Sequence, residues 1–281
     1  MNSVFRLLLL SSAVLVLFGC GNPSTNSQSP SNDSSATTVT ANQPFSYDDY
    51  ADVLATYVDD QGLVDYQSLQ ANREQLDRFV ASMGAVSPAT YQSWSESERL
   101  AFLINAYNAF TLQSIIDQKP LKKSIRDIPG VWKWRKFKVA GDNKTLDNIE
   151  HNTIRKDFNE PRIHVALVCA AISCPPLRKE PYTGNELNQQ LDDQVDKFVV
   201  SPHGFAIDKD KRKVFLSSIY KWFGEDWVKT YAANDQYTGN KNQKAVLNFL
   251  SGYLEPSDKD YLQKGDYDIS YLNYDWSLNR Q

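Results

Sequence analysis

Residues 95–118 read SESERLAFLINAYNAFTLQSIIDQ, and this stretch decides the fold. Ser95 and Glu98 have the spacing of a capping box, which predicts that a helix begins here, and Pro120 ends it near Gln118. Apolar side chains point nearly all round this helix instead of forming one stripe. We therefore expect a buried central helix that the rest of the chain surrounds.

Two amides, Asn105 and Asn108, interrupt the apolar surface of this helix. They stand three residues apart and so share a face. A buried amide must find hydrogen-bond partners, so the two side chains either bridge neighbouring backbone or line a site. Asn105 is a candidate site residue on the second interpretation.

The segments around the central helix mix helices and strands without regular βαβ alternation, which predicts an α+β domain over 45–281 with a mainly antiparallel sheet. Periodicity indicates helices over 45–58, 68–83, 146–158, 185–199, 218–232 and 241–252. Strands are expected over 132–139, 163–169 and 267–276, with a hairpin of 205–208 and 213–216.

The composition is that of a globular protein, with 41% apolar and 23% charged residues. Lys and Arg number 30 against 34 Asp and Glu, a net charge of -4, which argues against a nucleic-acid partner. Three cysteines are too few for a disulfide scaffold.

The first residues predict export. Arg6 precedes an apolar run from Leu7 to Phe18, which is too short to cross a bilayer and is typical of a signal peptide over 1–19. The stretch 17–20, LFGC, resembles the lipobox of bacterial lipoproteins. The resemblance implies that Cys20 is lipidated and that the membrane is a partner through this anchor.

Residues 20–44 are rich in Ser, Thr, Asn and Pro and lack aromatic residues, so we expect a disordered, lipidated tether. Gly21 follows the cysteine where an Asp would favour retention in the inner membrane. By similarity to that sorting rule, we expect an outer-membrane lipoprotein that faces the periplasm.

Cys169 and Cys174 are the cysteines of the folded part, spaced C-x4-C. In an oxidising compartment they could pair, provided that their Cα atoms lie within about 7 Å. Alternatively, Cys174 stays a reactive thiol, because Pro175 favours a helical turn whose unpaired N–H groups lower the pKa of a thiol.

His164 shares a face with Ala166 and Val168 on the expected buried strand, which leaves space above the imidazole. Either His164 or His151 could act as the general base for Cys174, with Glu150 or Asn105 orienting the ring. The spacings of these residues match no common metal-ligand pattern, and we expect neither a metal nor a cofactor. Residues 132–138, WKWRKFK, could stack on sugar-like or anionic ligands or form a half-solvated strand.

Six motifs together resemble a bacterial and plant family, the domain of unknown function 547. They are YVDDQGLVDY (57–66), FLINAYNA (102–109), IEH (149–151), RIHVALVCAAISCPPL (162–177), YKWFGED (220–226) and YDWSLN (274–279). Residues 168–170 read VCA where many members have Asn-Cys-Gly. The order of His164 and Cys174 is similar to that in circularly permuted papain-like proteins, and some members of the family are fused to thioredoxin-like modules.

Two functions of different classes remain open. The first is a thiol hydrolase or acyl transferase that acts on an amide or thioester, with Cys174 as nucleophile and His164 as base. The second is a non-enzymatic module that binds a small-molecule or peptide ligand, or an envelope partner, and has a structural Cys169–Cys174 disulfide. A disulfide that exchanges with thiols would indicate a third, redox function.

Overall fold

Helix α5 (Glu96–Ile116) begins at the predicted capping box and forms the centre of the fold. The Ser95 hydroxyl accepts the Glu98 N–H at 3.2 Å, and the Glu98 carboxylate accepts the Ser95 N–H at 2.8 Å. Nearly every side chain from Leu100 to Ile116 is buried, which confirms the prediction of a central helix.

The computed structural model describes residues 44–232 and 236–281. The signal peptide over 1–19, Cys20 and all but the last residue of the tether over 20–44 lie outside the described residues. Helices and small sheets of the described part form one domain and confirm the α+β class. None of the described helices has the length and apolar character that a bilayer crossing requires.

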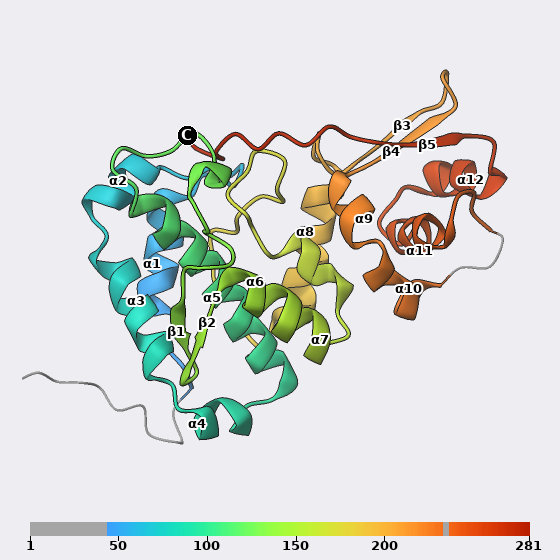
Figure 1. Cartoon of the computed structure of the whole chain (residues 1–281). Helices are drawn as coiled ribbons and strands as arrows, with labels where there is room; N and C mark the ends of the chain where they lie inside the picture. The colour runs from blue at the N-terminus through green and yellow to red at the C-terminus, as the bar shows by residue number, and fades with distance from the viewer. Residues whose placement is uncertain (1–43, 233–235) are drawn as a thin grey trace, which may run out of the picture. The chain divides into compact units, whose positions relative to one another are not determined.

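The N-terminal elements and a short hairpin pack around α5 and build the first core (Figure 1). Strands β1 and β2 pair antiparallel. These elements are α1 (Asp48–Tyr57), α2 (Tyr66–Ala71), α3 (Glu74–Ala85), α4 (Pro88–Ser93), η1 (Ile125–Asp127), β1 (Phe137–Val139) and β2 (Asp142–Lys144).

A helical segment that follows β2 supplies part of the site. It contains α6 (Leu146–Ile149), one π-helical turn η2 (Glu150–Ile154) and α7 (Arg155–Asp157). The 3-10 helix η3 (Pro161–Val165) comes next, and an irregular segment leads from it through both cysteines to α8 (Leu187–Val199).

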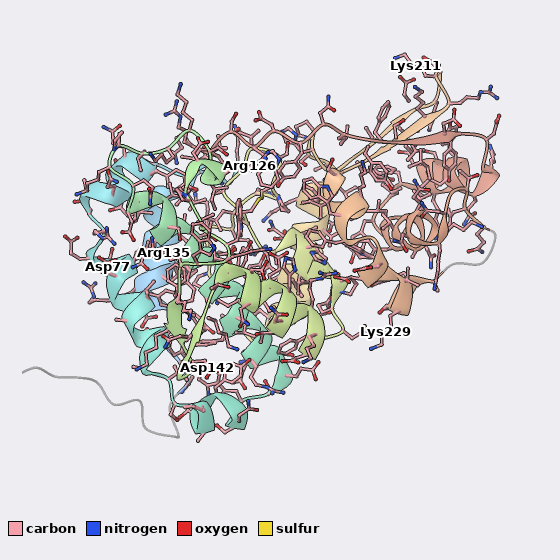
Figure 2. The ribbon with its side chains drawn as sticks, viewed as in Figure 1. Asp77, Arg126, Arg135, Asp142, Lys211 and Lys229 are labelled. Atoms are coloured by element: carbon pink, nitrogen blue, oxygen red, sulfur yellow. A yellow bond between two sulfur atoms is a disulfide. The ribbon has the colours of Figure 1, made fainter. Side chains whose placement is uncertain are left out.

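The C-terminal elements surround a second core that contains the fully buried Trp227. Strands β3 and β4 form the predicted hairpin, with Lys211 near its tip (Figure 2), and β5 joins β4 in parallel. These elements are β3 (Phe205–Asp208), β4 (Lys213–Leu216), α9 (Ser218–Phe223), α10 (Glu225–Tyr231), α11 (Lys241–Leu250), α12 (Pro256–Lys264) and β5 (Asp268–Tyr271).

After β5, residues 272–281 run back across the domain toward α2, and we call them the C-terminal strap (Figure 1). The strap holds the segment between the cysteines, because the Ile172 N–H donates to the Ser277 carbonyl at 2.8 Å and the Ser173 N–H to the Asp275 carbonyl at 3.2 Å. The strap therefore brings its own side chains to the cysteine segment.

Three predicted strands differ from the structure. The strand expected over 267–276 shortens to β5, and residues 272–276 belong to the C-terminal strap. The expected strand over 163–169 is wrong: this run begins in η3 and continues as irregular chain. Apart from His164 it is apolar, because it lies between the two cores, with Val165 in the second and Ile163 in the first. The strand expected over 132–139 shortens to β1, because the N–H groups of Lys133 and Trp134 donate to the Gly130 carbonyl in a turn.

Candidate functional site

Cys169 and Cys174 form a disulfide, with Cα atoms 6.2 Å apart. Cys169 is partly buried, whereas Cys174 is buried. The Cys169 N–H donates to the Cys174 sulfur at 3.0 Å, and the Tyr274 hydroxyl lies 3.1 Å from each sulfur. Burial and the negative charge of Glu150 raise the pKa of Tyr274, so its hydroxyl remains protonated and can donate to sulfur.

The disulfide lies in the wall of a cavity of about 300 Å³, a volume at the lower end of those that hold small ligands. Four predicted site residues meet here: Cys174, His164, His151 and Glu150. The complete lining is Tyr107, Trp132, Lys133, Asp147, Glu150, His151, His164, Leu167, Cys169, Cys174, Ile219, Trp222, Phe223, Tyr274 and Trp276.

His164 is buried at one side of this cavity, and its Nε2 lies 2.7 Å from an Asp226 carboxylate oxygen. Its ring stacks on Phe223, with centroids 4.2 Å apart. Burial lowers the pKa of His164 and outweighs the opposite effect of Asp226 and Glu150. The imidazole is therefore neutral near pH 7, and Nδ1 has no hydrogen-bond partner among the described residues.

Asp226, at the start of α10, links His164 to Arg155. The Arg155 guanidinium donates to both carboxylate oxygens, at 2.6 and 2.9 Å. Burial acts to raise the pKa of Asp226, but the hydrogen bonds and charges of His164 and Arg155 outweigh it, and the pKa lies well below 3.8. Asp226 is thus an anion that fixes the ring orientation of His164.

Glu150 and His151 lie on the π-helical turn η2. A π turn adds one residue to a helical turn and changes the direction of the side chains, and such turns are frequent at functional sites. Glu150 is only 9% exposed and lies beside the Tyr107 hydroxyl. Burial and the Glu150 carboxylate raise the pKa of Tyr107 well above its ordinary value. The His151 Nδ1 lies 3.2 Å from the Arg155 guanidinium and 3.9 Å from Glu150.

Asn105, the fifth predicted site residue, does not line the cavity. Its amide bridges backbone instead: it donates to the Tyr182 carbonyl at 2.7 Å and accepts the Tyr182 N–H at 3.0 Å. Asn108 bonds in the same way to the Ala166 carbonyl and the Val168 N–H, both at 2.9 Å. The two amides therefore tie the irregular cysteine segment to α5.

Sequence reasoning missed the contributions of Asp226, Tyr274, Trp222 and Trp276 to the site. The motifs YKWFGED and YDWSLN contain all four residues, but no sequence pattern shows that they approach the cysteines. Trp132 and Lys133 line the cavity, whereas Trp134 is 75% exposed and lies outside it. Across 44–232 and 236–281, no three His, Cys, Asp or Glu side chains are grouped so that they could hold a metal ion.

The buried neutral state of His164 makes the stability depend on pH. In the unfolded chain the imidazole takes up a proton below about pH 6.5, whereas the folded chain resists protonation down to a lower pH. We therefore expect the free energy of unfolding to fall as the pH drops from about 7 to about 5. Urea unfolding measures the free energy at each pH, and an NMR titration of the His164 ring measures its pKa. His151→Gln is the control. A ring that titrates near its ordinary pKa would contradict it.

Comparison with known proteins gives a family for the central segment alone. No curated protein and no solved structure matched the chain. The family model described as "Protein of unknown function, DUF547" matches residues 91–199. This match supports the DUF547 family for the segment that contains α5, Glu150, His164 and both cysteines.

Proposed function

We propose that the cavity is a thiol–disulfide exchange site at Cys169–Cys174. One observation carries the proposal: Cys169, the less buried of the two residues, is bonded to the buried Cys174, whose sulfur lies within hydrogen-bond distance of the Cys169 N–H and the Tyr274 hydroxyl. Exchange is fastest when the attacked sulfur is accessible and the departing thiolate is stabilised. The cavity offers both conditions, whereas a purely structural disulfide needs neither.

The exchange proceeds in two balanced steps. A substrate thiolate attacks the Cys169 sulfur, and the electron pair of the Cys169–Cys174 bond leaves on Cys174, whose thiolate accepts the Cys169 N–H and the Tyr274 O–H. A second substrate thiolate then attacks the substrate sulfur of the mixed disulfide and releases the Cys169 thiolate. Two substrate thiols are oxidised to a disulfide, and the protein disulfide is reduced to two thiols.

The direct test is to trap the mixed disulfide. The Cys174→Ser variant should accumulate an adduct with a disulfide-bonded probe at Cys169, detected by mass spectrometry. In a chain that keeps both cysteines, Tyr274→Phe should slow the reduction of the Cys169–Cys174 disulfide by a small thiol about ten-fold. This is the effect of one hydrogen bond to a charged sulfur. A wild-type disulfide that reacts no faster than an unstructured peptide disulfide would refute exchange and indicate the structural, ligand-binding alternative.

A second candidate is the thiol hydrolase or acyl transferase, and the His164–Asp226 pair favours it. Asp226 holds Nε2, so Nδ1 can serve as the base for a reduced Cys174, with the Cys169 N–H available to an oxyanion. In the disulfide form neither sulfur is hydrogen-bonded to His164 or His151 within the described segments, so this activity needs prior reduction. Reduced protein should then form an acyl adduct at Cys174 from a thioester, and His164→Gln should suppress it.

We also propose that the domain is anchored to the outer membrane through lipidated Cys20 and faces the periplasm. The apolar run from Leu7 to Phe18 and the LFGC stretch support this location. An oxidising compartment is also where a disulfide such as Cys169–Cys174 persists. Mass spectrometry of the mature N-terminus tests the anchor, and Cys20→Ser should move the protein from the detergent phase to the aqueous phase.

A further inference from the structure

Aromatic rings from three separate segments enclose the side of the cavity next to the disulfide. Trp132 comes from the turn after Gly130, Trp222 from α9, and Tyr274 and Trp276 from the C-terminal strap. Ring centroids lie 4.6 Å apart for Tyr274 and Trp276, 4.8 Å for Trp222 and Tyr274, and 5.8 Å for Trp222 and Trp276. Trp222 is 45% exposed, an unusual degree for a large ring that lines a cavity.

Glu150 contributes a nearly buried carboxylate to the same cavity. Among the described residues it has no lysine or arginine ion-pair partner, and the His151 ring lies 3.9 Å from it. Its negative charge reaches the disulfide end, because it raises the pKa of Tyr274, whose hydroxyl contacts both sulfurs. A carboxylate without a cation, beside aromatic faces, is the combination that binds organic cations.

The positive groups near the cavity are already engaged or exposed. The Arg155 guanidinium is held by Asp226 and Glu225. Arg126 (Figure 2) lies over the Trp276 ring at 5.2 Å from its centroid but does not line the cavity. Lys133 lines the cavity and is exposed to solvent, so water screens its charge. The buried end of the cavity is therefore negative.

We infer that the cavity selects thiols that carry a cationic group, an ammonium or a guanidinium, which lies among the tryptophans and near Glu150 while the thiol reaches Cys169. This inference rests on the proposed exchange function and names its substrate class. A sulfur compound of this kind is a small aminothiol or a peptide with a cysteine next to a basic group. Anionic thiols are disfavoured because Glu150 and Asp147 repel them.

Three thiols that differ in charge form the test: cysteamine, 2-mercaptoethanol and 3-mercaptopropionate. The rate of reduction of the full-length protein is measured at low ionic strength and divided by the rate with a neutral reference disulfide, which removes differences in thiolate content and nucleophilicity. We expect this normalised rate to be roughly ten-fold or more higher with cysteamine than with 3-mercaptopropionate. Glu150→Gln should bring this ratio close to one, because the amide keeps the shape but not the charge.

Glu225→Gln is the matched control, since Glu225 is 70% exposed and lies outside the cavity lining, and its ratio should equal that of the wild type. If the rate with the protein divided by the rate with the reference disulfide is above one and the same for all three thiols, the exchange function stands and the inference is wrong. Faster reaction of 3-mercaptopropionate would also refute it.

A binding measurement separates the inference from a failure of exchange. Tryptophan fluorescence of the wild-type protein should change on titration with butylammonium but not with butyrate, and Glu150→Gln should weaken the response. If no thiol reacts above the reference rate but butylammonium binds, exchange is refuted and the cation site remains. If butylammonium and butyrate give the same response, the cation site is refuted.

Discussion

The Asn108→Ala variant is expected to lose about 3–5 kcal/mol of its free energy of unfolding. The amide accepts the Val168 N–H and donates to the Ala166 carbonyl, both at 2.9 Å. Both backbone groups lie in buried residues, so removal of the amide leaves a buried donor and a buried acceptor without partners. Urea denaturation of the wild-type and variant proteins measures the loss.

Two further variants keep this prediction testable. Asn143→Ala removes an exposed amide from β2 and should change stability by less than about 0.5 kcal/mol. Asn108→Asp loses the donor to Ala166 and, while ionised, buries a carboxylate that faces this carbonyl, so its loss should be at least as large as that of alanine. A loss below about 1 kcal/mol in the alanine variant would show that water or another group satisfies the freed backbone.

The Asp226→Asn variant should lose about 2–3 kcal/mol of stability. The amide cannot neutralise Arg155, which is 20% exposed and donates twice to this carboxylate. The substitution also removes the Asp226 carboxylate, which raises the pKa of His164. The pKa of His164 should therefore fall further below its ordinary value. Denaturation measures the first effect, and an NMR titration of the His164 ring measures the second.

Glu225→Gln serves as the control here too, because this residue contacts the same guanidinium at 3.0 Å but is 70% exposed. An exposed ion pair contributes little, so the control should lose less than about 1 kcal/mol. Equal losses in the two variants would mean that the Asp226–Arg155 ion pair stabilises the fold no more than the exposed Glu225–Arg155 pair does.

Local patterns in the sequence were enough to predict α5 and the β3–β4 hairpin. The capping box at Ser95 and the turn residues between β3 and β4 act within a few residues, so neighbouring sequence contains the relevant information. The strand expected over 163–169 fails for the opposite reason. Asn108 on α5 bonds to the Ala166 carbonyl and the Val168 N–H. The N–H groups of Ala166 and Leu167 donate to the Ile163 carbonyl, so these groups of the run need no sheet partner.

The sequence alone determined which residues carry reactive groups: a stretch of 25 residues contains Glu150, His151, His164, Cys169 and Cys174. It also predicted the class of fold. Tertiary structure alone decided that Asp226 orients His164 and that Tyr274 contacts both sulfurs, contacts that span 62 and at least 100 residues. Such contacts depend on how α10 and the C-terminal strap pack, and packing is a property of the whole chain that no local pattern specifies.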